Sequence, residues 1–156
     1  MSIVAPEPLT RQALEFLKNQ SVMALATSSL QGEPQASSVY YTVDDDFNFY
    51  FLTGKDTRKE INLKHNPRVA FLIGTGPSVI TIQGGGTATL LPRFEQFELF
   101  THFSNALQSK DVNWPLTTLP HKDFAGFRIK PEWLVLLDLS EGTRPQAYQE
   151  GYQKII

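Results

Sequence analysis

The feature of this sequence that most constrains its fold is a series of strand-like runs joined by short polar breaks. Runs rich in β-branched and aromatic residues extend from Ser21 to Ser28, from Gln35 to Val43 and from Phe47 to Thr53. The breaks between them, at residues 30–33 and 44–46, are long enough for a hairpin but too short for a crossover helix. We therefore expect these runs to form an antiparallel sheet.

Strand-like runs continue through the rest of the chain. They are predicted from Arg68 to Ile73, from Val79 to Gln83, from Phe124 to Lys130 and from Trp133 to Ser140, with a turn at residues 74–77 and a joint at Pro131 and Glu132. Six or seven strands with three short helices predict a mainly β fold, a β-barrel with flanking helices, in a single domain of residues 1–156. The triplet Gly84–Gly86 is expected to form a bulge or sharp bend, or alternatively a place where a ligand approaches the backbone.

Three segments have helical patterns. Apolar spacing predicts an N-terminal helix up to about residue 19, and Thr57 and Glu60 fit a capping box that begins a short helix ending at or just before Asn66. Residues 141–156 are expected to form a polar tail on the surface or against a partner. A third helix is predicted from an aromatic stripe that should face the core, made of Phe94, Phe97, Phe100, Phe103 and Leu107.

The composition argues against several classes of function. The absence of cysteine excludes a disulfide scaffold, an iron–sulfur cluster, a thiolate zinc site and a cysteine nucleophile. Fourteen Lys and Arg against sixteen Asp and Glu give a net charge of −2 without a basic block, so we expect no nucleic-acid partner. Glu7 and Arg11 interrupt the N-terminus, and no apolar run approaches the ~18 residues of a membrane span. We expect a soluble protein in the cytoplasm without membrane contact.

Common catalytic and metal-binding patterns are also missing. His65, His102 and His121 are scattered and have no second ligand-type residue at metal spacing, so no metal site is expected. The serines do not form a G-x-S-x-G elbow, and the glycine pairs do not continue into a Rossmann or P-loop pattern. The sequence therefore predicts no catalytic acid, base or nucleophile.

Two segments suggest a ligand. Residues 53–59 combine a strand end, a tight loop, the hydroxyl of Thr57 and the cations Arg58 and Lys59 at a helix start, which suits a phosphate monoester. The alternative is an ordinary capped helix with solvated cations. The run from Ser37 to Thr42 does not alternate cleanly, so one face of this strand could lie against a flat conjugated ring; alternatively, Tyr40 and Tyr41 form a packing pair.

Taken together, these segments resemble the pyridoxamine 5'-phosphate oxidase-like family of FMN-binding split barrels. The resemblance covers the chain from about Val22 to Ser140 and is strongest between Ala36 and Gly84. The matching segments are Ser37–Thr42, Phe49–Thr53, Thr57–Lys59, Asn66–Val69, Val79–Gly84 and Phe127–Trp133. The resemblance implies an FMN-binding split barrel, antiparallel and six- to seven-stranded.

The resemblance also implies a set of cofactor-binding residues. Ser37, Ser38, Val39 and Tyr40 would lie along the flavin ring and ribityl chain, largely through backbone groups, and Leu52 and Thr53 would close over the same cofactor. Thr57, Arg58 and Lys59 would hold the FMN phosphate. Ser78 matches a position that contacts the ring from the neighbouring subunit, which implies a homodimer with FMN at its interface.

The chain departs from the true oxidases at positions that bind phosphate or substrate. Where their ring-contacting strand begins with arginine and ends with lysine, this chain has Ser37 and Thr42. Their late tryptophan falls on Leu137, and their C-terminal Arg-x-His has no counterpart in residues 142–146. The resemblance therefore implies an oxidoreductase in which FMN carries the hydride chemistry for an unidentified small molecule, with a nicotinamide as a possible reductant. The alternatives are a flavin carrier or redox sensor without turnover, or a relative that binds deazaflavin or haem.

Overall fold

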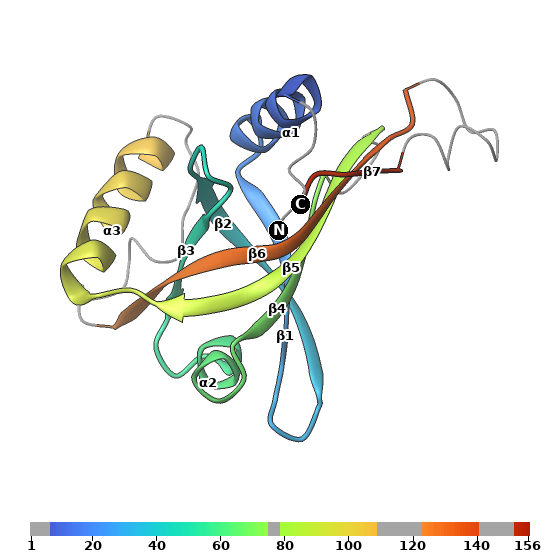
Figure 1. Ribbon diagram of the computed structural model, residues 1–156. Helices are drawn as coiled ribbons and strands as arrows, with labels where there is room; N and C mark the ends of the chain where they lie inside the picture. The colour runs from blue at the N-terminus through green and yellow to red at the C-terminus, as the bar shows by residue number, and fades with distance from the viewer. Residues whose placement is uncertain (1–6, 75–78, 109–122, 141–151) are drawn as a thin grey trace.

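The computed structural model describes residues 7–74, 79–108, 123–140 and 152–156, without the side chains of residues 107 and 108 (Figure 1). Ser78, the side chain of Leu107 and His121 therefore lie outside the described residues. The elements are α1 (Glu7–Asn19), β1 (Val22–Ser28), β2 (Pro34–Val43), β3 (Phe49–Gly54), α2 (Arg58–His65), β4 (Arg68–Ile73), β5 (Ile80–Leu90), α3 (Arg93–Gln108), β6 (Phe124–Asp138) and β7 (Tyr152–Lys154).

The strands form one antiparallel sheet that closes on itself. Their order is β3-β2-β1-β4-β5-β6-β7, and β3 also pairs with β6 from Phe49↔Ile129 to Gly54↔Phe124. This last pairing closes β1 to β6 into a six-stranded barrel, and β7 adds to the remaining edge of β6. In Figure 1, α1 and α2 lie near opposite ends of the barrel, and α3 packs beside β3 and β6. The expected mainly β, antiparallel six- to seven-stranded barrel is confirmed.

Alternate residues of each strand fill the barrel, because successive side chains of a strand point to opposite faces. In β2 the buried positions are Val39, Tyr41 and Val43. The Tyr41 hydroxyl donates a hydrogen bond of 2.6 Å to the Leu17 carbonyl, which ties α1 to the barrel, and burial raises the pKa of this phenol. The largest fully buried side chains are Phe49, Phe51, Phe124, Leu17, Met23, Leu25, Ile73, Ile82, Ile129, Leu134, Leu136 and Ile155.

β5 and β6 form a long ribbon that differs from the prediction in two ways. β5 runs through the glycine triplet, and β6 is one strand of 15 residues instead of two strands joined at Pro131. The register shifts between Gly85 and Gly86, where the pairing passes from Trp133 to Pro131 and skips Glu132. Proline has no N–H to donate, and its place at this irregularity lets the strand bend without ending. The bulge predicted at the glycine triplet is confirmed.

The predicted start of the third strand is wrong for a local reason. The third run was expected to begin at Phe47, but β3 begins at Phe49 because Phe47 adopts a positive φ of 61° in the turn. This turn is held by the Asp44 carboxylate, which accepts hydrogen bonds from the backbone N–H of Asp46 at 3.0 Å and of Asn48 at 2.8 Å. The turn therefore takes in Phe47 and Asn48, two residues that the apolar pattern assigned to the strand.

The expected placement of residues 141–156 on the surface or against a partner is wrong for Ile155. β7 pairs with β6, and Ile155 is fully buried in the barrel core. The Ile155 N–H also donates to the Leu134 carbonyl at 2.8 Å. Ile155 therefore completes the hydrophobic core with Ile156 packed against it, whereas Tyr152–Lys154 are exposed and residues 141–151 lie outside the described part of the chain.

The aromatic stripe of α3 faces the core only in part. Phe103 is 4% exposed, but Phe94 and Phe97 are 64% and 42% exposed. The buried face passes instead through Gln96, Leu99 and Phe103. A spacing of three residues falls short of the ~3.6 residues of a helical turn, so the stripe winds around the helix, away from the barrel at its N-terminal end. This arrangement leaves aromatic surface on the outside of α3.

Candidate functional site

β2 and β3 pair over only part of their length. Their pairing consists of Tyr41↔Phe51, Thr42↔Tyr50 and Val43↔Phe49. Beyond these pairs β2 continues beside β1 alone, and β3 continues beside β6 alone. Residues 37–40 and 52–54 therefore border a split in the barrel wall, which we call the β2–β3 split.

The backbone of β2 is open along this split. The Tyr41 N–H donates to the Ser21 carbonyl at 3.0 Å, on the β1 side of the strand. Because hydrogen-bonding direction alternates along a strand, the N–H and C=O groups of Ser38 and Tyr40 point the opposite way, into the split. Ser38 and the N–H of Tyr40 lie beyond the last β2–β3 pair of the described residues, Tyr41↔Phe51. They form an open backbone edge that can hydrogen-bond to a flat ligand.

The side chains of the same segment divide between the two faces of β2. Val39 is buried in the barrel, Ser38 is exposed on the outer face, and Tyr40 is half-buried there. Ser37 lies on the inner face, where its Oγ is buried without a hydrogen-bond partner, as is Oε1 of Gln35. A buried hydroxyl without a partner is uncommon, so Ser37 Oγ is a candidate contact for a bound molecule.

Thr57 caps α2 at the side of the split formed by β3. Its Oγ1 accepts a hydrogen bond from the Glu60 N–H at 3.4 Å and donates one to the Gly54 carbonyl at 2.9 Å. The Oγ1 of buried Thr53 lies 3.1 Å from that of Thr57. The N–H groups of residues 58 and 59, in the first turn, have no helical partner because no residue precedes them by a full turn. Hydroxyls and open N–H groups are thus gathered at this helix start.

Glu60 lies buried below the helix start and is fully paired. Its Oε2 accepts from the Asp56 N–H at 3.2 Å, and its Oε1 lies 2.6 Å from Nζ of Lys64. The predicted capping box of Thr57 and Glu60 is confirmed, with the carboxylate bonded one residue further back than the usual pattern. Because Lys64 offsets the carboxylate charge, the positive end of α2 remains suited to an anion.

The two cations of the helix start have different surroundings. Arg58 is exposed, and its guanidinium pairs at 3.2 Å with Glu33 of the β1–β2 hairpin. Lys59 is half-buried, and its ammonium forms no ion pair within the described residues. Burial lowers the pKa of Lys59. A desolvated cation at the positive end of a helix is unfavourable unless an anion meets it, which is the electrostatic environment expected of a phosphate site.

Leu52 and Thr53 point to opposite faces of β3. Thr53 lies beside Thr57, whereas Leu52 packs beneath α3 in a small cluster. The other buried members of that cluster are Leu91, Leu99, Phe103 and Phe124. The structure therefore places three parts of the chain at the β2–β3 split: residues 37–40, Thr53 and the start of α2. The side chain of Leu52 lies instead in the cluster beneath α3.

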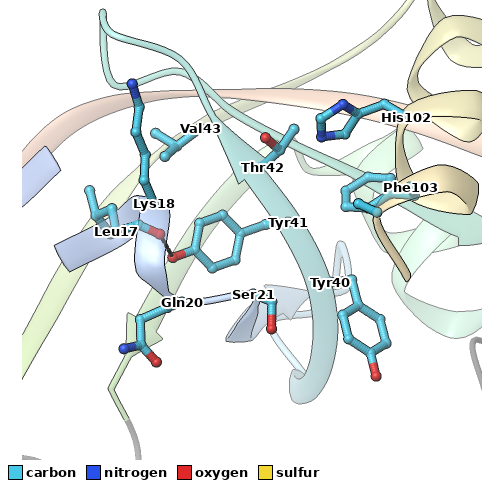
Figure 2. Close-up of a pocket in the computed structure, with 11 residues that line it drawn as sticks. Leu17, Lys18, Gln20, Ser21, Tyr40, Tyr41, Thr42, Val43, His102 and Phe103 are labelled. Carbon is cyan, nitrogen blue, oxygen red and sulfur yellow. Dashed lines mark hydrogen bonds between the residues drawn. The ribbon is translucent and has the colours of Figure 1, made fainter. Parts of the chain in front are cut away.

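Two cavities lie on the outer side of β2. One of about 160 Å³ is lined by α1, β2 and α3, and Figure 2 shows Tyr40, Thr42 and His102 around it. A larger one of about 480 Å³ lies between α3 and the strands β2 and β3. Thr42 and His102 line both.

Sequence reasoning missed several residues of this region. Glu33 pairs with Arg58 across 25 positions of sequence, and no local pattern points to it. The glutamates and the histidine that line the larger cavity come from α3, whose pattern was interpreted as a packing helix. Whether these side chains line a cavity depends on which strands α3 packs against.

The chain has the architecture of a split-barrel protein. Its six-stranded barrel has a split wall with an open backbone edge, and a capped helix start lies beside that edge. The chain belongs to the pyridoxamine 5'-phosphate oxidase family, whose sequence model matches residues 9–138. The family suggested by the sequence resemblance is therefore confirmed. No helix among the described residues combines the length and apolar character needed to cross a membrane.

Curated relatives within this family differ in what they act on. The chain is 35% identical over 92 residues to a pyridoxine/pyridoxamine 5'-phosphate oxidase of Crocosphaera subtropica, covering 58% of this chain and 43% of that protein. It is 32% identical over 93 residues to a 5a,11a-dehydrotetracycline/5a,11a-dehydrooxytetracycline reductase of Streptomyces rimosus, covering 54% of this chain and 66% of that protein. The chain thus spans less than two thirds of the length of either relative.

Solved structures show the same fold at low identity. A protein of unknown function from Agrobacterium tumefaciens has a TM-score of 0.70 at 19% identity, covering 92% of this chain and 61% of that one. A haem-binding protein from Mycobacterium smegmatis has a TM-score of 0.61 at 19% identity, covering 95% of this chain and 62% of that one. Proteins similar to this chain therefore include oxidases, a reductase and a haem-binding protein. Similarity alone does not assign a function, so the assignment depends on the chemistry of the site.

Proposed function

We propose that this chain binds FMN at the β2–β3 split and acts as an FMN-dependent oxidoreductase on a small molecule. The observation that carries the proposal is the open backbone edge of Ser38 and Tyr40 beside the capped start of α2. The edge offers hydrogen-bonding groups to a flat heterocycle, and the helix start offers N–H groups and cations to a phosphate.

The donor set at the split fits this cofactor. In the proposal, Ser38 and Tyr40 hold the ring and ribityl chain through backbone groups, and Val39 packs beneath them from the barrel core. The buried Oγ of Ser37 gains a hydrogen-bond partner. The phosphate lies at the start of α2, on Thr57, Arg58 and Lys59, with Thr53 behind the Thr57 hydroxyl. Leu52 supports the wall from beneath α3. The half-buried ammonium of Lys59 favours an anionic ligand such as a phosphate ester.

Bound FMN supplies the hydride chemistry, and the residues of the chain bind and orient it. No side chain at the split has to act as a general acid or base. Thr42 stands where the true oxidases place a substrate-binding lysine, so we propose a substrate other than pyridoxamine 5'-phosphate. The two curated relatives are both named as oxidoreductases but act on different substrates. This difference supports proposing an oxidoreductase without naming its substrate.

We further propose that the protein is a homodimer with FMN at the interface and with Ser78 reaching the ring of the neighbouring subunit. The exposed apolar side chains of Leu90 and Phe97, at 52% and 42% exposure, support a surface that is covered in an assembly. Light scattering after gel filtration tests this proposal. A monomer that binds FMN with full affinity would overturn the shared site.

The cofactor proposal is tested by removing the two cations together. The double variant Arg58→Ala, Lys59→Ala loses two charge-assisted contacts of about 1.5–3 kcal/mol each, so FMN affinity should fall by at least about 100-fold. The matched control, Arg11→Ala with Lys154→Ala, removes the same charges from exposed positions and should bind FMN normally. Affinity is measured by the quenching of flavin fluorescence. Unchanged affinity of the first variant would remove the phosphate site, and a colourless protein that binds no added FMN would overturn the assignment.

A second measurement separates an enzyme from a carrier. The FMN-loaded protein is mixed with NADH or NADPH without oxygen, and the loss of flavin absorbance is followed. Reduction supports an oxidoreductase. Flavin that stays oxidised with every nicotinamide donor would favour a carrier or redox sensor, and haem that binds more tightly than FMN would favour a haem-binding protein.

A further inference from the structure

A groove runs between α3 and the outer face of β2 and β3. It consists of the two cavities, of about 480 and 160 Å³, which are neighbours and share Thr42 and His102 as lining residues. Figure 2 shows these two side chains on facing elements, Thr42 on β2 and His102 on α3. The larger cavity lies within the range of about 300–1,000 Å³ typical of small-molecule sites. We call the whole feature the α3 groove.

The α3 groove adjoins the proposed cofactor site. Tyr40 lines the smaller cavity, and its backbone N–H points into the β2–β3 split. A molecule bound along Thr42 and Tyr40 would therefore lie next to a ring held at the split. This adjacency is what a substrate of a flavin enzyme requires.

The walls of the larger cavity are aromatic. Tyr50 lies on its strand side, and Phe94, which is 64% exposed, lies on its helix side. Rings on opposite sides of an open groove suit a planar molecule, and the face of an aromatic ring also attracts a cation.

The charges around this cavity are mostly negative. Glu95 is half-buried and Glu98 is exposed on α3, and neither forms an ion pair within the described residues. Across the groove the Asp44 carboxylate accepts a 2.9 Å hydrogen bond from the Tyr50 hydroxyl. Burial raises the pKa of Tyr50, Asp44 and Glu95 raise it further, and Arg128 on the neighbouring strand opposes them. Three carboxylates against one guanidinium make the groove unfavourable for an anion and favourable for a cation.

We propose that the α3 groove is the substrate site and that Glu95 and Glu98 select planar aromatic molecules that are cationic or uncharged, against phosphate esters and carboxylates. That the bound molecule is a substrate rests on the proposed function. The selectivity rests on the groove alone, because its aromatic and acidic lining is present whatever the split binds.

The selectivity is tested with two probes of the same shape and opposite charge. 1-Naphthylmethylammonium and 1-naphthoate are titrated calorimetrically into the FMN-loaded protein and into the FMN-free protein. We expect the cation to bind at least about tenfold more tightly than the anion, since each partly exposed carboxylate is expected to contribute a few-fold. The double variant Glu95→Gln, Glu98→Gln should weaken binding of the cation by about tenfold and strengthen that of the anion. The control Glu15→Gln, an exposed glutamate of α1, should change neither.

The outcomes separate the groove from the cofactor site. Equal binding of the two probes, preference for the anion, or a double variant that behaves like the wild type would overturn the selectivity. A protein that prefers the cation but binds no FMN would overturn the proposed function and leave the selectivity in place. Cation binding that is lost in the Glu15→Gln control as well would overturn the location of the site.

Discussion

Lys59 should destabilise the FMN-free protein and stabilise the complex. Its ammonium is half-buried in the first turn of α2, where burial lowers its pKa and the helix dipole opposes a positive charge. Lys59→Met keeps most of the apolar stem and removes the charge. Since a charge at a helix end is worth about 0.3–1 kcal/mol, the variant should gain about that much free energy of unfolding without FMN, or roughly 1–4 °C in Tm.

The same substitution should have the opposite effect on the cofactor. One charge-assisted contact to the phosphate is worth about 1.5–3 kcal/mol, so FMN should bind about 10- to 150-fold more weakly. Thermal unfolding followed by circular dichroism and a flavin fluorescence titration measure the two effects. Lys154→Met, which removes an exposed cation of β7, is the matched control and should change neither by much.

The stability gain should also depend on pH. Because the pKa of Lys59 is lower in the folded chain than its usual 10.5, the unfolded chain binds more protons between the two values. The contribution of Lys59 to stability therefore rises as pH increases through the lowered pKa and levels off near 10.5. The advantage of Lys59→Met should be largest at neutral pH and shrink in alkali. A variant that melts below the wild type without FMN, or that binds FMN with wild-type affinity, would refute this reasoning.

Three further substitutions test the site and the packing around it. Glu33→Gln should tighten FMN binding about two- to fivefold, because it releases Arg58 from an exposed ion pair worth at most about 1 kcal/mol; weaker binding in a fluorescence titration would contradict this. Tyr41→Phe removes the buried 2.6 Å hydrogen bond to α1 and should lower the free energy of unfolding in urea by about 1–2 kcal/mol, whereas an unchanged midpoint would show that the bond does not matter. Gly85→Ala would bring a Cβ to 2.5 Å from the Trp133 indole nitrogen, so it should cost about 1–3 kcal/mol and shift the tryptophan emission; unaltered emission would argue against this packing.

Features that depend on a few neighbouring residues were predictable from the sequence. The capping box of Thr57 and Glu60 and the hairpin breaks of β1 to β3 rely on hydrogen bonds and turns within short segments. The same local rules gave errors where a distant strand decides the outcome. Pro131 was interpreted as a joint, but pairing with β5 carries β6 through it, and Ile155 became a core residue only because β7 pairs with β6.

The candidate site shows the same division. The sequence by itself determined the contiguous helix start, Thr57 to Lys59, because a cap, a dipole and two cations lie within three residues. The tertiary structure decided that β2 pairs with β3 only from Tyr41 onwards, that Glu33 reaches Arg58, and that α3 sets its glutamates opposite Tyr50. Which edge a strand leaves open, and which charges face one another across a groove, depend on contacts between segments far apart in the chain, and no local pattern encodes those contacts.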